Sequence, residues 1–390
     1  MTPPSPTPAR PWRARLGTTG LFFGNGLGAG GWASAIPLIK ARLALSDAEL
    51  SVALLAMAVG AILLMPCAGL LAHRLGGAGR TLRFAAIGFA AMLGLIGLAP
   101  SLPALAALTF LFGAGNGLMD VGMNARASLV ERRWGAAIMS SFHAAWSCGG
   151  LAGATLGGLL MRAGAPAPWL LAVVGGAVLA IVAGSLPHIG ADGAGGGGHA
   201  FAWPQRRLAG LCAVALLGLM MEGAVADWCA VYLTSVVGLA PAAAAMGYAA
   251  FASSMLLGRL TGDFGVRRLG RTEIVMLGGA LAAVGFALVV AAPAPIVAIG
   301  GFCLIGLGLA NLVPAVFSAS AAMASSPALG VAMAATAGYA GFLIGPPLIG
   351  TVASIAGLRT SFALLAAATL AIVPLAAASV GRTRAARPQA

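Results

Sequence analysis

The sequence has 390 residues, of which 60% are hydrophobic and only 8% are charged. Soluble domains carry roughly a quarter charged residues, so this chain cannot cover a water-soluble surface. Its formal net charge is +13, but the arginines stand in short gaps between apolar segments rather than in one tail or on one face. This distribution argues against a nucleic-acid-binding protein and favours an integral membrane protein.

Apolar segments follow one another along the whole chain, and each is long enough to cross a hydrocarbon core of roughly 30 Å. We predict transmembrane helices at residues 16–39, 48–72, 82–99, 104–126, 136–161, 168–186, 208–235, 242–262, 272–291, 295–317, 329–354 and 360–380. The sequence therefore predicts an all-α integral membrane protein with twelve transmembrane helices. The longest gap, residues 187–207, contains four consecutive glycines and is typical of a flexible linker.

These segments divide the chain into five regions. We expect a disordered cytoplasmic leader at residues 1–15, a six-helix bundle at residues 16–186 and a cytoplasmic linker at residues 187–207. A second six-helix bundle follows at residues 208–380, and residues 381–390 form a cytoplasmic tail. The five cysteines lie in apolar segments without metal-binding spacing, so we expect no disulfide, no metal site and no cofactor.

The basic residues indicate the orientation in the membrane. If the N-terminus is cytoplasmic, eighteen basic residues fall on the cytoplasmic side and four fall outside, namely Lys40, Arg42, Arg162 and Arg359. Because basic residues collect on the cytoplasmic side, we expect a multi-pass protein of the cell inner (plasma) membrane with both termini in the cytoplasm.

A short glycine-bounded segment occurs twice. Residues Gly69–Gly76 follow the second predicted helix, and residues Gly258–Gly265 follow the eighth. The recurrence of this segment after the second and the eighth helix predicts two pseudo-symmetric halves of six helices each. Transporters built from repeats place their substrate site between the halves.

On these residues the chain resembles the major facilitator superfamily. Gly69–Gly76 is similar to the superfamily's signature between helices 2 and 3, with His73 at the usual position of an aspartate, and Gly258–Gly265 keeps an acid as Asp263. The resemblance implies gating roles for Arg74, Arg259 and Asp263. Three further segments resemble the rhizopine transporter-like (MosC-type) branch, namely Asn116–Asn124, Met139–Ser147 and Glu222–Trp228.

Three acids lie inside predicted helices, namely Asp120, Glu222 and Asp227. Because a charge at the bilayer centre costs about 2.5–3.5 kcal/mol, such residues are candidates for proton coupling and substrate binding. Glu222 and Asp227 lie about 140° apart around their helix, so they do not share a face. The alternative is that each carboxyl makes a structural hydrogen bond to a neighbouring helix.

Asn116, Asp120 and Asn124 recur at a spacing of four residues and form one polar stripe on an apolar helix. His143 lies at a similar depth on the next helix. The functional interpretation is a substrate or gate site on the cytoplasmic side. The alternative is a buried pair, Asp120 with His143 or with an arginine, that locks the two helices together.

Lone amides and aromatic side chains complete the candidate substrate site. Asn25 and Asn311 suit a polyhydroxylated or amide-bearing solute, although an interhelical hydrogen bond explains either amide equally well. Trp146, Trp228 and Tyr339 could stack on a ring, although aromatic residues at such depths usually serve packing.

We therefore expect a secondary active transporter, coupled to protons, for a small polar organic solute such as a sugar or an inositol-like compound. It would work as a monomer in the lipid bilayer without binding nucleic acid. The alternatives are a drug or cation efflux antiporter and, in another class, a membrane enzyme or sensor. An enzyme would need a nucleophile and a base, or a set of metal ligands, at the same depth in the membrane. Three of the four histidines instead fall in predicted loops, which argues against an enzyme.

Overall fold

The computed structural model describes residues 11–45, 47–189, 206–239, 241–291 and 294–380. In the first half of the chain the elements are α1 (Trp12–Arg42), α2 (Asp47–Leu64), η1 (Met65–Cys67), α3 (Ala68–Arg74), α4 (Ala78–Ile96), α5 (Leu102–Trp134), α6 (Met139–Arg162), α7 (Ala167–Ser185) and η2 (Leu186–His188). In the second half they are α8 (Ala209–Ser235), α9 (Pro241–Leu269), α10 (Arg271–Ala291), α11 (Pro295–Leu309), α12 (Leu312–Met323), α13 (Pro327–Ala356), α14 (Leu358–Leu370) and α15 (Ile372–Ser379).

The predicted all-α membrane fold is confirmed. Among the described residues, ten helical segments are long and apolar enough to cross a membrane, and α1 and α9 occupy the other two predicted positions. α1 is diluted by glycines, and α9 carries several charged residues near its end, which lowers the hydropathy of both. Three passes are interrupted: α2 continues through η1 into α3, α11 is followed by α12, and α14 by α15.

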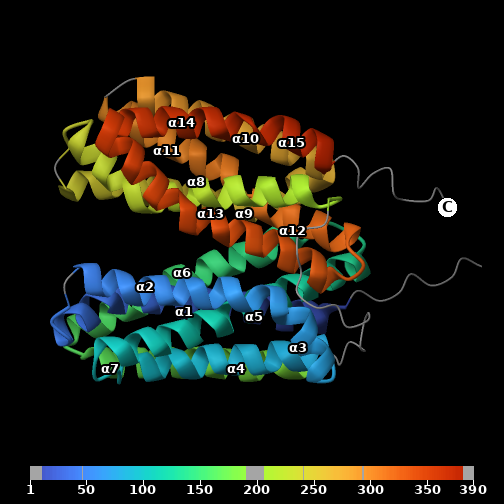
Figure 1. Ribbon diagram of the computed structural model, residues 1–390. Helices are drawn as coiled ribbons and strands as arrows, with labels where there is room; N and C mark the ends of the chain where they lie inside the picture. The colour runs from blue at the N-terminus through green and yellow to red at the C-terminus, as the bar shows by residue number, and fades with distance from the viewer. Residues whose placement is uncertain (1–10, 46, 190–205, 240, 292–293, 381–390) are drawn as a thin grey trace, which may run out of the picture.

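The two halves of the chain form two bundles that lie side by side, with α1–α7 below and α8–α15 above in Figure 1. Each bundle has its own aromatic core. Phe22, Phe89 and Phe142 lie in the first, and Phe286 and Phe362 lie in the second.

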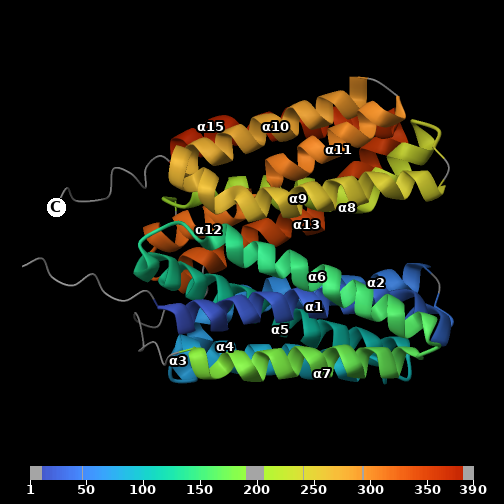
Figure 2. The same cartoon turned by 180° about the vertical axis from the view of Figure 1, so that it is seen from behind.

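One end of the molecule holds the beginning of α1 and the end of α15, on the right in Figure 1 and on the left in Figure 2. We call this end the terminal face and the opposite end the far face. The core of the second bundle also takes in Ala61, Met65, Ala68 and Val121 from the first bundle. The halves therefore pack together from the middle of the molecule toward the terminal face.

The helix bounds differ from the predicted ones at two functionally relevant places. Arg126 lies inside α5 and Arg259 lies inside α9, and each residue is only 5% exposed. Both were among the eighteen basic residues assigned to the cytoplasmic side, and the count stays strongly one-sided without them. α1 already begins at Trp12 within the predicted leader. Residues 1–10, 190–205 and 381–390 of the predicted leader, linker and tail lie outside the described residues.

Close approach of α1 and α6 depends on glycine. A Cβ atom added at Gly153 would lie 2.0 Å from the carbonyl oxygen of Leu27, which is far inside van der Waals contact, whereas one added at Gly158 would meet nothing within 4 Å. The backbone of α6 can therefore lie against α1 only because Gly153 has no side chain.

We expect Gly153→Ala to lower the thermal unfolding temperature of the purified protein. Overpacking costs typically about 1–3 kcal/mol, and the clash here is with backbone that cannot rotate away. Gly158→Ala adds the same methyl group to the same helix and serves as the control. Equal unfolding temperatures for the two variants would show that α1 and α6 are not in this contact.

Candidate functional site between the two halves

Polar side chains from four helices meet near the middle of the molecule. Asn25 of α1 donates to the Asn116 Oδ1 atom of α5 over 2.9 Å, and the Trp146 Nε1 atom of α6 donates to the Asn25 Oδ1 atom over 2.8 Å. The Asn116 Nδ2 atom reaches the Tyr339 hydroxyl of α13 over 3.5 Å. This last contact crosses from the first half to the second. We call these four residues, together with Glu222 and Arg259, the central site.

Arg259 is the buried cation of the central site. Its Nη1 atom donates to the Ser147 Oγ atom of α6 over 2.6 Å, and its Nη2 atom lies 3.8 Å from the Glu222 Oε1 atom of α8. Its guanidinium also lies 5.9 Å from the centre of the Trp146 ring. Glu222 therefore has a cationic neighbour, which the sequence did not reveal, and Arg259 connects the two halves at mid-depth rather than at the surface.

A second polar chain runs from α5 to α6 beside the central site. The Asn124 Nδ2 atom donates to the Asp120 Oδ1 atom over 3.1 Å, so the Asn124 Oδ1 atom is left to accept from the His143 Nε2 atom over 3.1 Å. The His143 ring packs edge-on against Phe22 and Phe317. Asp120 and His143 are thus linked through Asn124 and do not form the direct pair considered from the sequence.

The remaining predicted residues lie elsewhere. Asp227 is exposed, and the Trp228 ring lies against Gly350 of α13. Asn311 stands at the break between α11 and α12, where its side chain donates to the Gly258 carbonyl over 2.8 Å. Arg74 is exposed at the end of α3 and makes no hydrogen bond or ion pair with any described residue. None of these four side chains is bonded to the central site in the described part of the chain.

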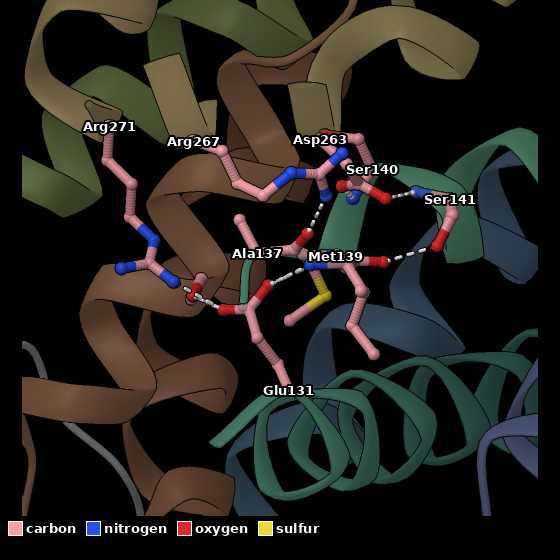
Figure 3. Close-up of polar contacts among 10 residues, drawn as sticks. Glu131, Ala137, Met139, Ser140, Ser141, Asp263, Arg267 and Arg271 are labelled. Carbon is pink, nitrogen blue, oxygen red and sulfur yellow. Dashed lines mark hydrogen bonds and ion pairs between the residues drawn. The ribbon is translucent and has the colours of Figure 1, made fainter. Parts of the chain in front are cut away.

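Asp263 ties the two halves together near the terminal face. Its two carboxylate oxygens accept from the backbone N–H groups of Ser140 and Ser141, at 2.8 and 3.0 Å, where α6 begins (Figure 3). A carboxylate is stabilised there because unpaired N–H groups and the positive end of the helix dipole point at it. One turn later, Arg267 donates to the Ala137 carbonyl over 2.9 Å. These contacts hold the end of α9 in the second half against the start of α6 in the first.

Glu131 makes a second set of contacts between the halves and was not among the predicted residues. One carboxylate oxygen accepts from the backbone N–H groups of Ile138 and Met139, at 2.9 and 2.8 Å. The other accepts from Arg271 over 2.5 Å and from the Ser318 hydroxyl. Figure 3 shows Glu131 reaching from the first half toward Arg271 of the second. With a side chain 6% exposed, this carboxylate is fully bonded and links the two halves at the terminal face.

The chain has relatives along nearly its whole length. Residues 18–338 match the sequence profile of the Major Facilitator Superfamily. The chain is 35% identical over 359 residues to an uncharacterised MFS-type transporter of Yersinia pestis, covering 92% of this chain and 93% of the relative. It is 34% identical over 372 residues to membrane protein MosC of Rhizobium meliloti, covering 94% and 90%.

Solved structures share the fold. The fucose:proton symporter FucP of E. coli is similar with a TM-score of 0.74 at 15% identity, covering 93% of this chain and 97% of the symporter. The proton:xylose symporter XylE is similar with a TM-score of 0.72 at 15% identity, covering 96% of each chain.

Proposed function

Because this chain belongs to the Major Facilitator Superfamily, we propose that it is a proton-coupled secondary transporter that moves a small polar solute by alternating access. Membership makes it a multi-pass membrane transporter rather than an enzyme. The solute class and the coupling ion are the proposed part. One chain supplies both halves of the central site, which supports a monomer as the working unit.

The central site carries the proposal for the solute. It offers two amides, a phenol, an indole and a guanidinium from both halves of the chain. These donors and acceptors, with aromatic rings beside them, suit a polyhydroxylated solute such as a sugar or an inositol-like compound. The similar folds of a fucose:proton and a proton:xylose symporter support the same class. Pairing of Glu222 with Arg259 leaves less negative charge for a cationic drug, which weakens the efflux alternative.

Glu222 is the proposed coupling carboxyl. Ionised, it attracts the Arg259 guanidinium 3.8 Å away, and protonated it would release that guanidinium toward Ser147 and the solute. Proton and solute would then bind to one shared group, which is the requirement for coupling. Asp120, half-buried and linked to His143 through Asn124, is a second carboxyl for the same task.

The orientation follows from the arginines. We place the terminal face in the cytoplasm of a cell with an inner membrane, since most arginines outside the helix interiors lie toward that end. We interpret the contacts of Glu131 and Asp263 as a closed gate, which then faces the cytoplasm, so the conformation is the outward-facing one.

A binding screen tests the solute class. We expect sugars or polyols to raise the unfolding temperature of the purified protein, while amino acids and lipophilic cations leave it unchanged. Asn116→Leu should weaken the responding solute about tenfold or more, because it removes a bonded amide from the site. Ser354→Ala, an exposed change in α13, is the control. A response to lipophilic cations alone would replace this proposal with drug efflux.

A further inference from the structure

A large hollow lies beside the closed gate on the terminal face. It measures about 970 Å³, and residues of both halves line it. Arg132 comes from the end of α5, Arg207 from the turn before α8, Arg267 from the end of α9 and Arg271 from the start of α10. Figure 3 shows Arg267 and Arg271 on the second-half side of Glu131.

The arginines that line the hollow carry more positive charge than the Glu131 carboxylate neutralises. Glu131 is the acid in its lining, and that carboxylate already pairs with Arg271. Arg267 donates to a neutral carbonyl, so its charge is not compensated there. Arg132 and Arg207 are exposed, and neither guanidinium has a hydrogen-bond or ion-pair partner among the residues that the structure describes. Three uncompensated guanidinium groups therefore converge on one concave surface.

We propose that this hollow binds an anion that carries phosphate groups. Guanidinium groups match phosphate oxygens with two parallel hydrogen bonds, and a concave basic surface concentrates anions. The hydroxyls of Ser128 and Thr272 in the lining add further donors. The same chemistry is offered by a soluble phosphorylated compound and by an anionic lipid headgroup.

Binding at this place has a conformational consequence. Arg132 belongs to the first half of the chain, whereas Arg207, Arg267 and Arg271 belong to the second, so the four converge only while the gate is closed. An anion that binds all four favours the closed gate by its difference in affinity between the two conformations. The bound anion would therefore inhibit gate opening. It need not be the transported solute.

Pyrophosphate is the probe for the soluble source. We expect it to raise the unfolding temperature of the full-length protein in detergent more than sulfate does at equal ionic strength. We also expect pyrophosphate to protect Arg132 and Arg207, but not Arg80, from modification by phenylglyoxal, as read by mass spectrometry of the unaltered chain. Arg80 is an exposed arginine at the start of α4 and does not line the hollow.

The double variant Arg132→Gln/Arg207→Gln should weaken pyrophosphate binding about tenfold or more, since it removes two charge-assisted partners. Arg80→Gln should leave it unchanged. Nanodiscs test the lipid source. If the wild-type protein is more stable in phosphatidylglycerol than in phosphatidylcholine, and the double variant loses this difference, the anion is the lipid headgroup. Equal stabilisation by pyrophosphate and sulfate would overturn the proposal. So would a double variant whose unfolding temperature still rises both with pyrophosphate in detergent and in phosphatidylglycerol nanodiscs.

Discussion

Glu131→Gln is expected to open the terminal face. The substitution removes the charge that holds Arg271 and weakens the bonds from the Ile138 and Met139 backbone. Breaking a buried charged network of this kind costs on the order of 2–4 kcal/mol, which shifts the ratio of closed to open molecules roughly 30-fold or more. Spin labels at Leu75 and Leu269, exposed in different halves near this face, should report a longer distance by pulsed electron resonance.

Glu49→Gln makes the same chemical change at an exposed residue where α2 begins, at the far face, and should leave the distance distribution unchanged. Transport by Glu131→Gln should also fall, because the protein can no longer hold the outward-facing state. An unaltered distance distribution in Glu131→Gln would mean that this carboxylate does not control the gate.

Glu222→Gln is expected to abolish proton-driven accumulation while leaving solute binding. The amide keeps the shape of the side chain but can neither attract Arg259 by charge nor exchange a proton. In proteoliposomes, uptake driven by a pH gradient should fall at least about tenfold, a loss typical of removing an essential proton-transfer group. Downhill exchange of labelled solute at equal pH should persist, because it needs the central site but not the proton.

Asp227→Asn shows which of the two acids of α8 is needed for proton-driven uptake. Asp227 is exposed and has no ion pair with any described residue, whereas Glu222 lies 3.8 Å from Arg259. The Asp227→Asn variant should therefore keep most of its proton-driven uptake. If instead it loses that uptake while Glu222→Gln retains it, the coupling role belongs to Asp227.

Much of the fold was predictable from local information. Apolar length, glycine linkers and the repeat of Gly69–Gly76 at Gly258–Gly265 are properties of the chain itself, and a bilayer leaves few other arrangements for them. The stripe of Asn116, Asp120 and Asn124 was visible for the same reason, because helical periodicity alone places its members on one face. The structure brings these residues together with His143 and Tyr339.

The gate was not predictable to the same degree. Glu131 stands beside two arginines at a helix end, which is where a solvated acid is expected, and its partners lie far along the chain at Arg271 and Ser318. Arg259 was misplaced because a predicted helix ending at residue 262 puts it near a gap, whereas α9 continues to Leu269. The ion pair with Glu222 depends on how α8 and α9 pack.

The two copies of the repeated signature have different roles in this conformation. Asp263 of the second copy holds the beginning of α6, whereas His73 and Arg74 of the first copy are exposed. An imidazole at that position cannot accept two N–H donors as a carboxylate does. The contacts between the halves at the terminal face therefore run through Asp263 and Glu131 rather than through the first copy of the signature.

Accumulation of solute in proteoliposomes is the direct test of proton-coupled transport of a polyhydroxylated solute. Liposomes with an alkaline interior would be incubated with a mixture of sugars, inositols, amino acids and lipophilic cations, and their contents identified by mass spectrometry. We expect a polyhydroxylated solute to accumulate with the wild-type chain, and we expect collapse of the pH gradient or Glu222→Gln to prevent this. Accumulation that does not depend on the pH gradient would contradict proton-coupled transport. So would the absence of any solute enriched above its level in protein-free liposomes.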